Sequence, residues 1–343
     1  MKALVLTEYM KLEYRDVPDP GLQADEVLVE VKAAGICGSD VHGMDGSTGR
    51  RIPPLIMGHE ASGIIRETGK NTKNWKKGDR VTFDSTIYSL VDWYTRKGMY
   101  NLSDGRMVLG VSAKEFRRDG AYAEYVAVPS HILYRIPDNV SFTRAAMVEP
   151  AAVALHAVNL TPLAVNDTAV VVGTGMIGLF IVQMLRLAGC THIAAVDIDS
   201  DKLDMALKSG ATLALNPEKS DIVREVQEIS GGRGADTAFE VVGNSPALNT
   251  AINSVRKGGT VTLVGNLSPA AEIPLQAVVT RQLRLQGSCA INGEYEPVLK
   301  LMEKGLVDTG IVLSAEAPLS EGAEWFKRLY NKEKGLIKVV LLP

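Results

Sequence analysis

A glycine-rich turn between an apolar run and an apolar helical segment constrains the fold of this chain more than any other feature. The turn, G-T-G-M-I-G, spans residues 173–178 and directly follows the run at 168–172. Its first glycine, Gly173, allows a tight turn, and its second, Gly175, lets the backbone approach a pyrophosphate. Its third, Gly178, lets the helix pack closely on the strand, and the start of that helix offers free N–H groups to phosphates. The sequence therefore predicts a dinucleotide-binding strand–turn–helix unit.

An acidic residue stands where the ribose of such a cofactor would be bound. Asp197 lies 19 residues after Gly178, at the end of the next predicted strand. A carboxylate there accepts hydrogen bonds from ribose hydroxyls and repels a 2′-phosphate. Lys202 can sit over the same ribose. The alternative is an ordinary aspartate that caps the following helix. The glycine turn, the spacing to Asp197 and its acidic side chain all indicate a ribose-binding carboxylate. We therefore expect NAD rather than NADP as the cofactor.

Two different patterns of apolar residues divide the chain into two parts. From about residue 153, strand-like runs alternate with helical stretches, which is the pattern of a parallel sheet. Residues 1–150 carry short runs between Gly, Pro and Asp, which indicates a β-rich, partly open barrel. Residues 291–343 lose the alternation and are interpreted as returning to the first domain. The expected domains are 1–152 with 291–343, and 153–290; the expected strands include 27–31, 123–128, 168–172, 192–196, 238–242, 260–264 and 283–286, and the expected helices include 177–187 and 202–208.

The composition excludes several classes of protein. The 343 residues are 46% hydrophobic and 22% charged, with a net charge of −3, which is typical of a globular protein without a surface for nucleic acid. No apolar run has the length of a membrane span, and the N-terminus does not resemble a signal peptide. Three cysteines cannot form a disulfide framework, which favours a cytoplasmic protein with reduced thiols.

Four residues before the glycine turn carry metal-binding chemistry. Cys37 lies in C-G-S-D-V-H, His59 and Glu60 in G-H-E, and Glu149 in M-V-E-P. A thiolate, an imidazole and carboxylates form a mixed ligand set of the kind that zinc takes in catalytic sites, where one position stays open. A metal that polarises an oxygen, beside a dinucleotide-binding fold, indicates hydride transfer to or from an alcohol carbon.

In this order and spacing, the motifs resemble those of the zinc-dependent medium-chain dehydrogenases over essentially the whole chain. Alcohol dehydrogenases of that family usually have a second cysteine where this chain has Glu149, and the polyol (sorbitol-type) branch has glutamate. The resemblance implies an α/β fold, with a GroES-like β-rich catalytic domain and a Rossmann domain with a doubly wound parallel sheet. It implies that Cys37 and His59 bind zinc, that Glu60 can swing onto the metal, and that Glu149 is a ligand or is bridged to the metal by water.

The same resemblance implies a path for the substrate proton. The Ser39 hydroxyl would take the proton and pass it through the cofactor ribose to His42 near solvent. The main chain at residues 264–266 and 288–290 would border the nicotinamide. The cofactor-binding residues expected from the turn and the resemblance are Gly173, Gly175, Ile177, Gly178, Asp197, Lys202, Val264 and Asn266.

A second, structural zinc that is common in this family is not expected here. Its four cysteine positions correspond to Ser89, Asp92, Thr95 and Ser103, which make a poor zinc site. Side-chain hydrogen bonds and packing, with a contribution from Trp93 and Tyr94, would hold this lobe instead; a mobile loop is the alternative. We therefore expect one zinc per subunit.

The favoured function is NAD- and zinc-dependent oxidation of a secondary alcohol, namely a polyol, sugar or cyclitol. A threonine- or butanediol-type dehydrogenase is the alternative within the class; a decayed NAD-binding protein and a zinc-free quinone-type reductase are alternatives outside it. Arg50 and Arg51 can meet an anionic substrate, although a solvated charge pair is the favoured interpretation. A homodimer or homotetramer is expected, because the strand near 283–286 would leave an exposed sheet edge in a monomer.

Overall fold

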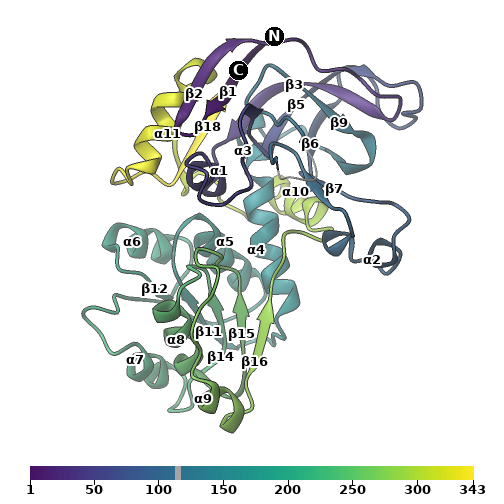
Figure 1. Cartoon of the computed structure of the whole chain (residues 1–343). Helices are drawn as coiled ribbons and strands as arrows, with labels where there is room; N and C mark the ends of the chain where they lie inside the picture. Colours follow the sequence, from purple (N-terminus) through teal and green to yellow (C-terminus); the bar gives the residue numbers. More distant parts are fainter. Residues whose placement is uncertain (113–116) are drawn as a thin grey trace. The chain divides into compact units, whose positions relative to one another are not determined.

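The chain folds as two units, and the first is assembled from two separate stretches of sequence. The computed structural model describes residues 1–112 and 117–343. The first unit contains Met1–Glu149 and Tyr295–Pro343, and the second contains Pro150–Glu294 (Figure 1). Among the described residues, no helix has both the length and the apolar character needed to cross a membrane.

The second unit is built on a six-stranded parallel sheet with the strand order β13-β12-β11-β14-β15-β16. Every residue of the central strand β11 is buried, as a strand covered on both faces requires. Helix α5 packs on β11 and β12, and α8 packs on β11 and β14. The strands are β11 (Thr168–Val172), β12 (His192–Val196), β13 (Leu213–Leu215), β14 (Ala235–Glu240), β15 (Val255–Leu263) and β16 (Arg284–Gly287); the helices are α4 (Val148–Leu160, which starts in the first unit), α5 (Met176–Leu187), α6 (Ser200–Lys208), α7 (Ile222–Ile229), α8 (Ser245–Ser254) and α9 (Leu275–Thr280).

This sheet confirms the predicted parallel α/β architecture, with two strands misplaced by several residues. The strand expected at 260–264 is β15, which already begins at Val255. The strand expected at 238–242 is β14, which begins at Ala235 and ends at Glu240. The strand stops there because the Glu240 carboxylate accepts hydrogen bonds from the backbone N–H groups of Val242 (2.8 Å) and Gly243 (2.7 Å). Gly243 has a φ of +86°, which turns the chain away from the sheet.

The first unit is β-rich, as expected for a GroES-like domain. Its main sheet has the path β10-β6-β5-β3-β18-β17, with β9 also paired to β3, and a three-stranded sheet has the order β2-β1-β4. A large buried cluster that includes Leu4, Val29, Phe83 and Phe326 forms its core. The strands are β1 (Lys2–Glu8), β2 (Lys11–Asp16), β3 (Glu26–Gly35), β4 (Leu55–Ile56), β5 (Glu60–Thr68), β6 (Arg80–Phe83), β7 (Thr86–Ile87), β8 (Met107–Val108), β9 (Tyr125–Pro129), β10 (Leu133–Arg135), β17 (Leu313–Pro318) and β18 (Lys338–Leu342); the helices are α1 (Gly38–Gly43), α2 (Trp93–Arg96), α3 (Phe142–Ala146), α10 (Tyr295–Glu303) and α11 (Gly322–Tyr330).

The expectation that strand–helix alternation ends at residue 291 is wrong. The C-terminal stretch forms β17, α11 and β18, and the two strands are parallel neighbours. Strand β18 also pairs antiparallel with β3. The last strand of the chain therefore lies inside the main sheet, where it carries Lys338 into a fully buried position.

Candidate metal centre and cofactor-binding turn

The pairing of two antiparallel strands brings the predicted metal ligands together. In the β3–β5 ladder, Gly35 at the end of β3 lies opposite Glu60 at the start of β5. Cys37 follows two residues after Gly35 and is the N-cap of α1, while His59 directly precedes β5. One ligand atom each of Cys37, His59 and Glu60 lies within 4.8 Å of the others. The structure thus places sulfur, nitrogen and oxygen donors from distant parts of the sequence at one point.

The residues at this point fit a zinc ion. Among the described residues, Oε1 of Glu60 is a buried carboxylate oxygen without a hydrogen-bond partner. A buried polar atom of this kind is costly unless a further group satisfies it. Sulfur, imidazole nitrogen and carboxylate oxygen are ligands that zinc accepts together.

A buried carboxylate orients the candidate histidine ligand. Asp40 is fully buried in α1, and its Oδ2 lies 3.3 Å from Nδ1 of His59. The same oxygen accepts a hydrogen bond of 2.9 Å from the Tyr122 hydroxyl. With Nδ1 facing Asp40, Nε2 is the nitrogen left for a metal, and a carboxylate in this place also makes the imidazole a better ligand.

The charges around His59 attract a cation. Burial lowers the pKa of His59, but the nearby charges of Asp40 and then Cys37 outweigh it, so the pKa is raised well above its ordinary value in the metal-free protein. Burial raises the pKa of Asp40, but His59 and Arg51 outweigh it and hold the pKa well below its usual range. The Asp40 carboxylate and the Cys37 sulfur therefore favour a positive charge at His59, which a bound metal ion would supply in place of the proton.

Glu149 lies near the three converging residues but outside their group. It stands in the first turn of α4 with its side chain partly enclosed. The loss of solvent, followed by the charge of Glu60, raises the pKa of Glu149 to about 8. Two carboxylates so close together repel each other unless a cation lies between or beside them.

A lysine that the sequence analysis missed is paired with Glu60. Both side chains are fully buried, and Nζ of Lys338 donates to Oε2 of Glu60 and to the carbonyl oxygen of Ile36 (3.0 Å). The lysine thereby occupies one carboxylate oxygen and leaves Oε1 for another partner. The one signal in the sequence was a single charged residue at the start of the apolar run K-V-V-L-L.

The proposed proton path lies at the start of α1. Ser39 Oγ donates to Sγ of Cys37 (3.2 Å), and His42 is exposed to solvent in the same short helix. The interpretation of Arg50 and Arg51 as a solvated pair is wrong for Arg51. Arg50 is exposed, whereas Arg51 is only 4% exposed and forms an ion pair with Asp40.

In the second unit, the glycine turn has the geometry that its sequence predicts. Gly173 has a φ of +95°, and a Cβ on it would lie 2.6 Å from a Val242 methyl group. A Cβ on Gly178 would lie 2.0 Å from the carbonyl oxygen of Gly173, so both positions require glycine. A Cβ on Gly175 would meet nothing within 4 Å. The backbone there is open to a ligand, and α5, which includes Ile177, starts without a side-chain cap.

Asp197 contacts the glycine turn directly. Its Oδ2 accepts hydrogen bonds from the backbone N–H (2.8 Å) and the hydroxyl (3.2 Å) of Thr174. The N-cap of α6 is Asp199, so the alternative in which Asp197 caps that helix is wrong. Lys202 is half-buried in α6, and Val264 and Asn266 follow β15. These residues lie after parallel strands of one sheet or in the helix that follows, which is where such folds bind dinucleotides.

The remaining cysteines and histidines have other environments. Cys190 is buried, and burial raises its pKa to about 11. Cys289 is exposed. His156 lies 3.0 Å from Glu294 within the second unit, and His131 packs edge-on against Tyr88.

The lobe that would hold a structural zinc is joined by its own side chains. Asp92 accepts a hydrogen bond from the backbone N–H of Thr95 (2.7 Å) and another from the Ser103 hydroxyl. Oγ of Ser103 in turn accepts a hydrogen bond from the backbone N–H of Ser89 (3.2 Å). The predicted hydrogen-bonded lobe is therefore observed. Trp93 contributes little to its interior because its side chain is 61% exposed.

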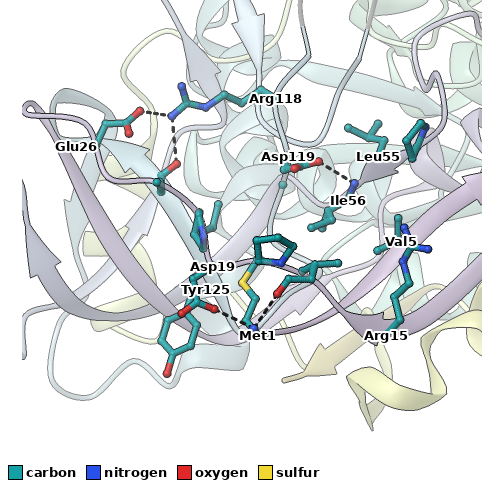
Figure 2. A pocket seen from close by; sticks show the side chains of 18 of the residues that line it. Met1, Val5, Arg15, Asp19, Glu26, Leu55, Ile56, Arg118, Asp119 and Tyr125 are labelled. Atoms are coloured by element: carbon teal, nitrogen blue, oxygen red, sulfur yellow. Dashed lines mark hydrogen bonds and ion pairs between the residues drawn. The ribbon is translucent and has the colours of Figure 1, made fainter.

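A hollow of about 530 Å³ lies elsewhere in the first unit, and its charged groups are already paired (Figure 2). Arg118 pairs with Glu26, and Asp119 accepts a hydrogen bond from the backbone N–H of Ile56 (3.0 Å). None of the predicted site residues lines this hollow. It is therefore not a candidate for the reaction centre.

Two family models match parts of the chain. Residues 23–138 match the alcohol dehydrogenase GroES-like domain, and residues 177–304 match the zinc-binding dehydrogenase family. The chain is 31% identical to sorbitol dehydrogenase of Bacillus subtilis, over 100% of this chain and 97% of that protein.

Two solved structures have the same fold. The 2R,3R-butanediol dehydrogenase of Bacillus subtilis superposes with a TM-score of 0.90 at 32% identity, over 100% of this chain and 99% of that one. A zinc-binding dehydrogenase from Sinorhizobium meliloti, described as putative and bound to NADP, has a TM-score of 0.92 at 29% identity, with coverage of 100% and 99%.

Proposed function

The chain belongs to the zinc-binding dehydrogenases with an alcohol dehydrogenase GroES-like domain, and on that premise we propose that it oxidises a polyol, sugar or cyclitol at a secondary alcohol, with NAD as acceptor. The convergence of Cys37, His59 and Glu60 is the observation that carries this proposal. It also disfavours a decayed NAD-binding protein and a zinc-free reductase, because neither would need these three donors at one buried point.

Each part of the site has a distinct role in this proposal. Zinc would supply a Lewis acid that favours ionisation of the alcohol, and NAD would supply the hydride acceptor. Cys37 and His59 hold the metal, and Asp40 keeps the imidazole in the binding orientation. Ser39 accepts the substrate proton, and the exposed His42 releases a proton to solvent. Glu60 and Glu149 complete the anionic surroundings.

The preference for NAD rests on Asp197. Its carboxylate already accepts two hydrogen bonds from Thr174, which hold it beside the glycine turn. A negative charge fixed there binds ribose hydroxyls and repels a 2′-phosphate. We expect wild-type kcat/KM to be clearly higher with NAD than with NADP. The replacement Asp197→Ala should reduce the ratio of these two kcat/KM values. Equal efficiencies in the wild type would contradict the assignment.

The preference for a substrate with neighbouring hydroxyls rests on Glu149. A carboxylate where a thiolate is usual makes the site harder and more polar, so it tolerates a hydroxyl beside the reacting one. Simple primary alcohols would leave polar groups of the pocket unpaired. A butanediol is the second candidate, favoured by the likeness to the butanediol dehydrogenase structure along the whole chain.

A substrate screen with a metal analysis tests the proposal. NADH formation is measured at one pH with ethanol, butanediols, threonine, linear polyols and inositols. We expect a polyol, sugar or cyclitol to have the highest kcat/KM; a win for ethanol or threonine would overturn the substrate class but not the zinc chemistry. The replacement Cys37→Ala should remove zinc and turnover together, whereas Cys190→Ala, at a buried thiol of the second unit, should keep the zinc.

A further inference from the structure

Arg51 is a buried cation that the proposed chemistry does not yet use. Its Nε donates to Oδ1 of Asp40 at 2.8 Å, and its Nη2 lies 2.7 Å from the same oxygen. The stem of the side chain packs against α1 so closely that a Cβ on Gly43 would lie 2.5 Å from Cγ of Arg51. A guanidinium held in this way is fixed in position and is not a mobile surface charge.

The same guanidinium reaches the proposed proton path. Nη2 of Arg51 donates a hydrogen bond of 3.2 Å to Oγ of Ser39. Asp40 therefore joins two functions of the site through its two oxygens, because Oδ1 holds Arg51 and Oδ2 faces His59. Through its side chain, Arg51 therefore contacts Asp40 and Ser39 together.

A count of the bonding capacity of Ser39 shows what this contact does. A hydroxyl has one proton to donate and two lone pairs that accept. In the structure, one lone pair of Ser39 Oγ is taken by Arg51 and the proton points to Sγ of Cys37. One lone pair is left, and it is the one that an incoming substrate hydroxyl can use. Arg51 therefore sets the direction from which Ser39 can accept a proton.

Resting on the proposed function, we propose that Arg51 is a positioning residue of the proton path, which holds Ser39 Oγ so that one of its lone pairs is left for the substrate hydroxyl. The O–H bond of the substrate breaks as its proton forms a new bond with Ser39 Oγ, and the electron pair stays on the substrate oxygen. The proton that Ser39 first held turns away from Sγ of Cys37 and is passed on towards His42, whose ring nitrogen accepts a proton and releases it to solvent. Ser39 ends as a neutral hydroxyl, and no oxidant or reductant takes part in this step.

Substitutions at Arg51 test the proposal against a purely structural role. The replacement Arg51→Gln removes the charge, and Arg51→Lys keeps a charge beside Asp40 but lacks the second N–H arm that reaches Ser39. Arg50→Gln, at the exposed neighbour, removes the same charge from the surface and is the matched control. Each is made in the wild type and in a Ser39→Ala background, and kcat, KM, the solvent deuterium isotope effect and zinc content are measured.

We expect Arg51→Gln to lower kcat by roughly 10- to 100-fold, with KM little changed and the solvent isotope effect increased. Arg51→Lys should lie between this variant and the wild type, and zinc content should stay the same in both. In the Ser39→Ala background, the Arg51 substitutions should have no further effect. If Arg51→Gln does not fold, Arg51→Lys is judged by the same criteria.

Two results would overturn the proposal. One is an equal fold-loss from the Arg51 substitutions with and without Ser39. The other is loss of zinc in both Arg51 variants, which would place the action of Arg51 on His59 through Asp40. A wild type that holds zinc yet forms no NADH from any alcohol would instead refute the proposed function, so the two failures are distinguishable.

Discussion

The buried pair of Lys338 and Glu60 permits a quantitative prediction of stability. Both side chains are fully buried, and Lys338 also donates to the carbonyl oxygen of Ile36. The replacement Lys338→Met keeps the length of the apolar stem, so little packing is lost. It leaves the Glu60 carboxylate buried without its cation, and the loss of one partner of a buried pair costs about 3–5 kcal/mol. We expect metal-free Lys338→Met protein to be destabilised by that amount.

The double replacement Lys338→Met with Glu60→Gln isolates the pair. Without the carboxylate charge, the missing ammonium matters less, so the double variant should be less destabilised than the sum of the single variants. We expect a coupling free energy of about 2–3 kcal/mol in the double-mutant cycle. With zinc bound, the cost of Lys338→Met should fall, because a divalent cation beside Glu60 compensates its charge.

The assay is unfolding in urea, monitored by tryptophan fluorescence. The three tryptophans, Trp75, Trp93 and Trp325, all belong to the first unit, so their signal reports on the unit that contains the pair. Lys327→Met, an exposed position in α11, is the matched control and should change the free energy of unfolding by less than about 0.5 kcal/mol. The reasoning fails if Lys338→Met costs less than about 1 kcal/mol, or if the single effects simply add.

Three further predictions concern other parts of the chain. In the lobe, Asp92→Ala should speed proteolytic cleavage around residues 89–103, whereas Asp104→Ala should not. Elemental analysis should give one zinc per subunit. Two tightly held zinc ions would contradict the hydrogen-bonded lobe. Light scattering at about micromolar concentration should show a dimer or tetramer, because β16 is an edge strand of the six-stranded sheet; a monomer would refute this assembly. Burial raises the pKa of Glu294, but hydrogen bonds from His156 and the Asn292 backbone outweigh it and lower the pKa. Its contribution to stability is therefore present above the ordinary carboxyl pKa of 4.5 and is lost as the pH falls through the lowered pKa. The difference in stability between wild type and Glu294→Gln should shrink over that range in urea titrations, and a constant difference would be the contrary result.

Sequence patterns of short range predicted much of this fold. The run at 168–172, the turn at 173–178 and the following helix correspond to β11, the glycine turn and α5, because period, turn chemistry and helix start all act between near neighbours. The same holds for the strand at 192–196 and for Asp197 at its end. The motifs around Cys37, His59 and Glu60 named the donor atoms, although their convergence depends on the β3–β5 ladder.

Tertiary structure alone decided how these donors are supported. Lys338 and Glu60 are 278 residues apart, and they meet only because the last strand is inserted beside β3. The sequence predicted that Arg51 is a solvated charge. In the structure, its side chain packs against α1 and lies close to Gly43. Local propensity is set by neighbours along the chain, whereas the cost of a buried charge depends on the partner that packs against it. The sequence therefore specified which side chains can bind a metal or transfer a proton. The packing specified which of these side chains are fixed in position and which are paired with an opposite charge.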